Sequence, residues 1–213
     1  MARNISRRLS GLRRDDSGAT MVEFAIGVML FLVFTSGLVE FTLAFWQWNA
    51  AAKALQVGAR LASVSDPVSS DLATLTGMEG GAAPGAKMPY FKRVCSGAGG
   101  GSCSDGGTYS AAAMNTIVNG RDGNCGTLGA DGYPGMCDIF SRITPANVRI
   151  TYTHTGLGFA GRPGGPVPTI TLELTGLTYS FVFLNALLRF PPITIPAMRT
   201  TITGEDLSTA APS

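Results

Sequence analysis

The chain has 213 residues, which is enough for one domain and an appendage, because domains commonly take about 100–200 residues. Charged residues make up only 14% of the sequence, against about 25% in typical soluble domains, and the mean hydropathy is positive. This composition disfavours a soluble enzyme, and a formal net charge of +2 is too small to indicate nucleic acid as a partner.

A basic segment opens the chain and an apolar run follows it. The basic residues are Arg3, Arg7, Arg8, Arg13 and Arg14. No charge occurs from Phe24 to Val39, and after Glu40 the chain is again uncharged up to Lys53. A bilayer core requires about 20 mostly apolar residues, so we expect a single transmembrane helix over about Phe24 to Trp46, with its basic end in the cytoplasm. A cleaved secretory signal is the alternative, but its apolar core would cover only about 7–15 residues.

The helix is expected to continue beyond the membrane. No proline precedes Pro67, and small or apolar residues recur at spacings of three and four, at the positions Trp48, Ala52, Leu55, Ala59 and Ala62. Another face carries Lys53, Gln56, Arg60 and Ser63. The sequence therefore predicts one continuous helix from about Ala19 to Val64, which ends before Asp66-Pro67. Two separate helices over the same residues are the alternative.

Two carboxylates interrupt the apolar helix. Glu23 stands at its start, and acids within membrane segments are candidates for a functional role, although Glu23 could instead lie among lipid headgroups. Glu40 is about 100° from Glu23 around a straight helix, so the two do not form a catalytic pair. Gly37, Ala44 and Gln47 share the face of Glu40, which suits helix–helix contact in lipid. The alternative, that Glu40 reaches the outer interface, fits the pattern equally well.

The start of the apolar run resembles the cleavage site of type IV prepilin-like proteins, in which a glycine is followed by four residues and then by Glu-Phe. Over about residues 17–63 the sequence contains GAxxVEFA, a second acid in GLVEF, an aromatic pair after it and a closing AxxxGAR. With these features it resembles the TadE-like family of tight-adherence (Tad, or Flp-type) pilus assembly proteins.

The resemblance implies a maturation step and a place in a machine. A prepilin peptidase would cut between Gly18 and Ala19, at the motif that ends in Glu23 and Phe24. Glu23 would then neutralise the new N-terminus of a neighbouring subunit, since a buried carboxylate is tolerated when it is paired. The protein would lie in the bacterial inner membrane and act with other pilin-like subunits and the Tad secretion platform.

Residues 65–146 are rich in Gly, Ser, Ala and Asp and contain all four cysteines: Cys95, Cys103, Cys125 and Cys137. Outside the cytoplasm an even number of cysteines indicates disulfides. Three pairings are possible, and we favour the sequential one, Cys95–Cys103 with Cys125–Cys137. The spacings are wider than those of usual zinc ligand pairs, so no metal is expected. A short helix closed by Gly120 is predicted within 108–120.

The last third of the chain is predicted to form strands. Apolar and polar residues alternate over 148–154, 170–175 and 177–183, and 193–203 also has strand character, whereas 184–190 could form a helical turn. Such runs predict a small antiparallel sheet with one buried face. The expected fold is therefore α+β and pilin-like. Its expected regions are a leader (1–18), a transmembrane and amphipathic helix (19–64), a disulfide region (65–146) and a β-rich region (147–213).

The sequence offers no catalytic constellation. Gly156, Gly158 and Gly161 match G-x-G-x-x-G, but prolines follow where phosphate binding requires a helix. His154 is the only histidine and is expected to be an ordinary strand residue. We expect no cofactor and no catalysis.

The role that the resemblance implies is that of a minor pseudopilin or accessory Tad pilus subunit. The main alternative is a membrane-tethered extracytoplasmic binding or adhesion protein without a role in a filament. A membrane-anchored periplasmic enzyme is less favoured, because the exported part has one histidine and few acids.

Overall fold

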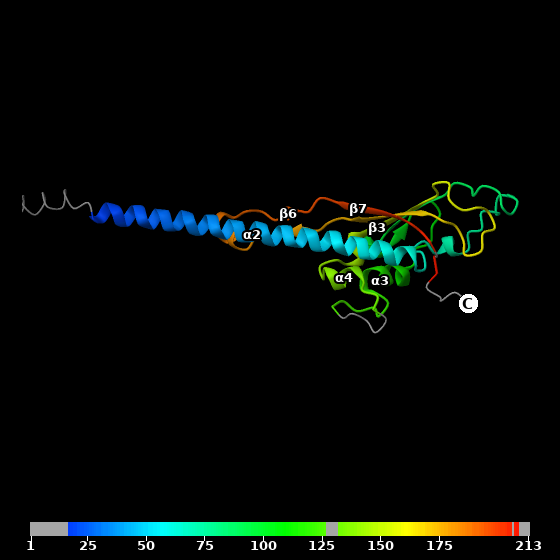
Figure 1. Ribbon diagram of the computed structural model, residues 1–213, viewed down its shortest axis with the longest axis horizontal. Helices are drawn as coiled ribbons and strands as arrows, with labels where there is room; N and C mark the ends of the chain where they lie inside the picture. The colour runs from blue at the N-terminus through cyan, green and yellow to red at the C-terminus, as the bar shows by residue number, and fades with distance from the viewer. Residues whose placement is uncertain (1–16, 127–131, 206, 209–213) are drawn as a thin grey trace, which may run out of the picture. The chain divides into compact units, whose positions relative to one another are not determined.

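The computed structural model describes residues 17–126, 132–205 and 207–208 (Figure 1). Its helices are α2 (Ser17–Ser63), α3 (Ala111–Asn119), α4 (Met136–Ile139) and α5 (Phe183–Leu188), with 3₁₀ turns at Ser70–Ala73, Ala98–Gly100 and Pro145–Asn147. Its strands are β1 (Lys92–Ser96), β2 (Ser102–Cys103), β3 (Val148–Thr153), β4 (Thr169–Leu174), β5 (Thr178–Tyr179), β6 (Ile193–Thr194) and β7 (Met198–Thr203). The fold is α+β, as the sequence predicted.

The chain divides into two compact units. The first, called the helix unit below, consists of Met1–Ala44 and Ser180–Pro191. The second, called the sheet unit, consists of Phe45–Tyr179 and Pro192–Ser213. The helix unit thus combines the beginning of the chain with a late segment, which carries α5. The four regions drawn from composition alone stay a prediction.

α2 is one unbroken helix of 47 residues, which confirms the prediction of a continuous helix. At about 1.5 Å per residue it extends over about 70 Å. No proline interrupts it, and it ends shortly before Pro67. In its apolar part the hydroxyls of Thr35 and Thr42 donate hydrogen bonds to carbonyls four residues earlier, at 2.9 and 2.8 Å. These polar groups therefore have partners within the helix and do not require water.

The sheet unit contains a five-stranded antiparallel sheet in the order β2-β1-β3-β4-β7. The buried side chains of β3 and β4 are Val148, Ile150, Tyr152, Ile170, Leu172 and Leu174. On the opposite face Arg149, Glu173 and Arg199 lie side by side, and Glu173 bonds Arg199 at 3.0 Å. One face is buried and the other is polar, which confirms the predicted sheet.

The second part of α2 packs into the core of the sheet unit. Its buried positions are Ala51, Ala54, Leu55, Gly58, Ala59, Leu61, Ala62 and Ser63, the last of which the sequence pattern assigned to the polar face. A Cβ on Gly58 would lie 2.5 Å from Sδ of Met136 in α4 and 3.2 Å from Cδ2 of Leu172 in β4, so glycine permits a close approach. The predicted stripe is correct at Leu55, Ala59 and Ala62 but wrong at Trp48, whose side chain is 37% exposed.

The strand predictions require two corrections. The run 177–183 yields only the short β5, which pairs with β6 in a separate two-stranded sheet, because the chain enters α5 at Phe183. The sequence did not predict β1, a short basic run in a Gly- and Ser-rich region that becomes a strand by pairing with β3. α3 and α5 confirm the helices expected within 108–120 and 184–190.

Candidate functional site

The first turns of α2 carry the predicted cleavage motif. Gly18 and Ala19 lie in its first turn, Glu23 and Phe24 follow one turn later, and all four are exposed. A Cβ built on Gly18 meets no atom within 4 Å, so packing in the described structure does not require a glycine there. The leader predicted at 1–18 lies, up to residue 16, outside the described residues.

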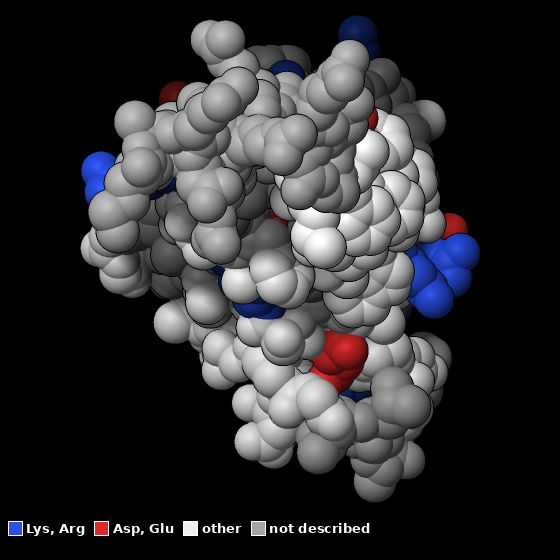
Figure 2. All heavy atoms as spheres, turned by 90° about the vertical axis from the view of Figure 1, so that its left-hand side faces the viewer, with Lys and Arg blue, Asp and Glu red and all other residues white. Residues whose placement is uncertain are grey.

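Among the described residues, one helix is long and apolar enough to cross a membrane, Gly18–Ser63. Its first half exposes large apolar side chains on several sides, among them Met21, Phe24, Met29, Phe31 and Phe34. Figure 2 views the molecule from the side on which α2 begins, and uncharged residues predominate among the described atoms there. Such a helix surface suits lipid as its solvent.

Glu40 binds the start of α5 within the helix unit. Its side chain is 1% exposed, although it lies in the apolar half of α2. One carboxylate oxygen accepts a hydrogen bond from the backbone N–H of Phe183, and the other accepts one from the N–H of Leu184 at 3.1 Å. Amides in the first turn of a helix have no partner inside that helix. Glu40 therefore caps α5, and its carboxylate is satisfied inside the protein.

Aromatic side chains pack next to the contact between Glu40 and α5. The rings of Phe41 and Phe181 meet edge to face with centroids 5.7 Å apart, and Phe181 also packs edge to face on Phe190 at 5.8 Å. Leu184 is buried beside them. Hydrogen bonds to a carboxylate are stronger than those between neutral groups, and burial strengthens them further. The face of α2 that the sequence assigned to contact with another helix is thus used, at Glu40, by the chain's own α5.

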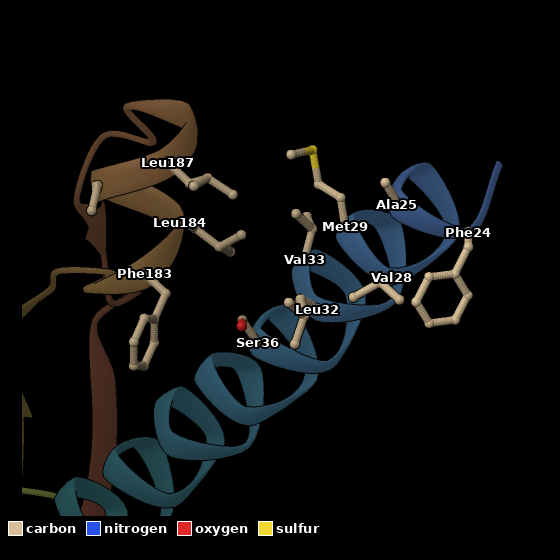
Figure 3. Close-up of a pocket in the computed structure, with 11 residues that line it drawn as sticks. Phe24, Ala25, Val28, Met29, Leu32, Val33, Ser36, Phe183, Leu184 and Leu187 are labelled. Carbon is tan, nitrogen blue, oxygen red and sulfur yellow. The ribbon is translucent and has the colours of Figure 1, made fainter. Parts of the chain in front are cut away.

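A groove of about 620 Å³ lies between α2 and α5 (Figure 3). Leu184 and Leu187 of α5 point toward Met29 and Val33 of α2 in this view. The remaining lining is also apolar except for Ser36, within the part of the chain that the structure describes. The helix unit therefore has a concave apolar surface next to the buried carboxylate.

The comparison with known families falls on the same helix. Residues 18–60 match the family of TadE-like proteins. This segment is TadE-like. The predicted resemblance is confirmed over these residues, and it indicates involvement in Tad pilus assembly, in a family that is structural rather than catalytic. No curated protein and no solved structure matches the chain.

The TadE-like segment covers most of α2, whereas the sheet, both disulfides and α5 lie outside it. The sequence indicated Glu40 as a candidate but did not indicate its partners in α5, because the donors are the backbone amides of Phe183 and Leu184. Backbone groups leave no residue-type signal. The available signal was the run of uncharged residues between Glu173 and Arg189, which contains α5 and several large apolar side chains.

The cysteines of the chain form two disulfides in the sheet unit, outside the TadE-like segment. Cys95–Cys103 joins β1 to β2, and Cys125–Cys137 joins the segment after α3 to α4. These are the sequential pairs favoured from the sequence. All four sulfurs are used, and within residues 17–126, 132–205 and 207–208 no three His, Cys, Asp or Glu side chains gather as a metal site.

His154 directly follows β3 and packs as a core residue. Its ring lies against Phe91 with centroids 5.8 Å apart, and its backbone N–H donates to the Phe91 carbonyl at 3.0 Å. Burial, and then the charge of Lys87, lower the pKa of its imidazole below the usual value. Beyond it Gly156 and Gly158 adopt left-handed backbone angles in a loop that leads to β4, so the glycine motif forms turns.

Proposed function

We propose that this protein is a minor pseudopilin or accessory structural subunit of a Tad-type pilus assembly machine, which supports fibre biogenesis and surface adhesion. The observation that carries the proposal is the TadE-like match over residues 18–60, which coincides with one unbroken helix. That helix has an exposed apolar first half, and its second half packs against a small antiparallel sheet. This combination is what a pilin-like subunit requires: an anchor in lipid and a folded domain outside it.

The proposal includes an orientation in the bacterial inner membrane. The arginines of the leader would hold the N-terminus in the cytoplasm, since positive charge next to an apolar helix is retained inside. The sheet unit would then be exported, into a compartment where disulfides persist. A prepilin peptidase at the cytoplasmic face would cut after Gly18 and leave the apolar helix in the mature chain.

Cleavage would place a charged amino group on Ala19, one turn before Glu23. Glu23 is exposed, so a partner can reach it. We assign Glu23 the role of pairing with the new N-terminus of an adjacent pilin-like subunit, because two opposite charges in lipid are tolerated when they are paired. The Tad secretion platform would assemble such subunits.

The replacement Gly18→Leu tests this route. Since a Cβ at Gly18 meets no atom, the variant should fold and insert normally. A protease pocket built closely around a glycine excludes a larger side chain, so the variant should remain as a precursor that still carries Met1–Gly18. Mass spectrometry and N-terminal sequencing of the protein purified from membranes would measure this.

Gly27→Leu is the matched control, because Gly27 lies in the same helix and a Cβ there also meets no atom within 4 Å. This variant should be cut after Gly18 like the wild type. A wild-type protein that retains Met1, or one that has lost its apolar segment, would overturn the pseudopilin proposal. Retention of Met1 would instead favour a membrane-tethered binding or adhesion protein.

A further inference from the structure

The segment Ser180–Pro191 exposes several large apolar side chains, of which Phe183 and Leu187 also line the groove toward α2. Val182, Phe183, Leu187 and Leu188 are 69%, 57%, 64% and 55% exposed, whereas Phe181 and Leu184 are buried. Large apolar side chains exposed so close together in the chain are a liability for aggregation in water and usually mark a contact surface. The position of the segment in the helix unit indicates whether water, lipid or another protein surrounds these side chains.

The position of α5 is set by Glu40. The two hydrogen bonds from Phe183 and Leu184 hold the start of α5 beside residue 40 of α2. From there the groove between the two helices extends along α2 as far as Phe24 (Figure 3). Residues 24–39 are the uncharged stretch of α2. α5 thus lies alongside the part of α2 that is apolar enough to be surrounded by lipid.

The backbone of the segment is suited to that location. In hydrocarbon every N–H requires a partner within the protein, because no water is available. Glu40 accepts from the amides of the first turn of α5. Ala186 donates to the carbonyl of Val182 at 3.1 Å, and Arg189 donates to that of Asn185 at 2.9 Å. The buried carboxylate thus gives the first two amides of this short helix a partner within the protein.

The side chains favour lipid over a second protein as the neighbour of α5. Helix contacts between membrane proteins are enriched in small residues, which let two backbones approach closely. Of the exposed residues of α5, Phe183, Leu187 and Leu188 instead have large apolar side chains, and Asn185 and Ala186 are exposed beside them. Arg189 follows α5 and is exposed, and a long arginine side chain can extend toward headgroups while its stem stays apolar.

We infer that Ser180–Pro191 is a re-entrant membrane segment: its outer side contacts lipid acyl chains, and an acyl chain fills the groove between α2 and α5. The protein then enters the bilayer twice, once with α2 and once with this segment. The inference rests on the proposed location of α2 in a membrane, and it adds a second membrane contact that the TadE-like match does not include.

The test uses the full chain in vesicles of phosphatidylcholine and phosphatidylglycerol. Leu188→Cys at the end of α5 and Val182→Cys just before it each place a thiol at an exposed position of the segment for an environment-sensitive fluorophore, attached without reduction so that the disulfides stay intact. Phe34→Cys on α2 and Thr201→Cys on the polar face of the sheet are the two reference positions. Quenching by spin-labelled acyl chains is compared with quenching by iodide in the buffer.

We expect the labels at positions 188, 182 and 34 to lose most of their fluorescence to the acyl-chain quencher and to resist iodide, with the opposite result at 201. If position 34 behaves in this way but 188 and 182 are quenched by iodide, the re-entrant segment is refuted and the membrane location of α2 stands. Protection of 188 and 182 from both quenchers would show that a protein or second copy covers α5, which also refutes the inference. Iodide quenching at 34 would refute both proposals.

Discussion

The two carboxylates of α2 differ in what they can bind. Both oxygens of Glu40 accept hydrogen bonds from α5, and its side chain is buried within its own chain. Glu23 lies on the exposed surface of the first turns. An acid that pairs with a neighbouring subunit has to be accessible before assembly. Of these two residues, Glu23 meets that requirement, and Glu40 has a structural role in holding α5.

We expect Glu23→Gln to be cut after Gly18 and inserted in the membrane but to fail in pilus assembly. Loss of one member of a buried ion pair costs about 3–5 kcal/mol, because the remaining charge is uncompensated. Glu23→Asp keeps the charge and should assemble better than Glu23→Gln. Immunoblots of membrane fractions would report processing and insertion, and electron microscopy would count pili. Normal piliation of Glu23→Gln would place this acid among lipid headgroups without a partner.

At the scale of elements, α2 meets the sheet unit through small side chains. Gly58 lies opposite Met136 and Leu172, where an added Cβ would be 2.5 Å and 3.2 Å from the nearest side-chain atoms. We expect Gly58→Val to destabilise the sheet unit by about 1–3 kcal/mol, the usual cost of overpacking a core. Denaturant unfolding of the full chain in detergent, followed by near-ultraviolet circular dichroism, would measure the loss.

Gln56→Val is the comparison variant, because Gln56 is exposed on the same part of α2. Glycine is a poorer helix former than glutamine, so helix propensity alone would favour Gly58→Val over Gln56→Val. A larger loss of stability in Gly58→Val therefore reports the steric contact. Equal stability of the two variants would show that α4 and β4 can move away without cost.

Periodic patterns in the sequence predicted the long helix and the central strands. The remaining elements depend on contacts between segments that are distant in sequence. The sequence predicted α2 and the alternating burial of β3 and β4, because these patterns depend on residues close together in sequence. β1 was not predicted, since its pairing with β3 joins residues more than fifty positions apart. The capping of α5 by Glu40 joins residues 143 and 144 positions apart through backbone amides, which no pattern of residue types records.

At the scale of the whole molecule, the proposed export predicts complete oxidation of the cysteines. The pairs Cys95–Cys103 and Cys125–Cys137 lie in the sheet unit, and the wild-type protein denatured without reduction should take up no thiol reagent. After reduction it should take up four equivalents. Each pair contributes about 2–4 kcal/mol when its loop is closed. Free thiols in the unreduced wild-type protein would contradict both the disulfides and the exported location.

The short strands β5 and β6 pair with each other at the base of a long connection, residues 180–192. Thr178 pairs with Thr194 and Tyr179 with Ile193, so the chain that leaves after β5 returns to the strand beside it. Backbone hydrogen bonds already hold the two ends of this excursion together. Closing this excursion therefore depends little on its length, since doubling a loop adds only about 0.6 kcal/mol. Insertions and deletions between Arg189 and β6 would leave the register of β4 and β7 intact, whereas a change of length that displaced Phe183 and Leu184 would remove the donors of the buried Glu40 carboxylate.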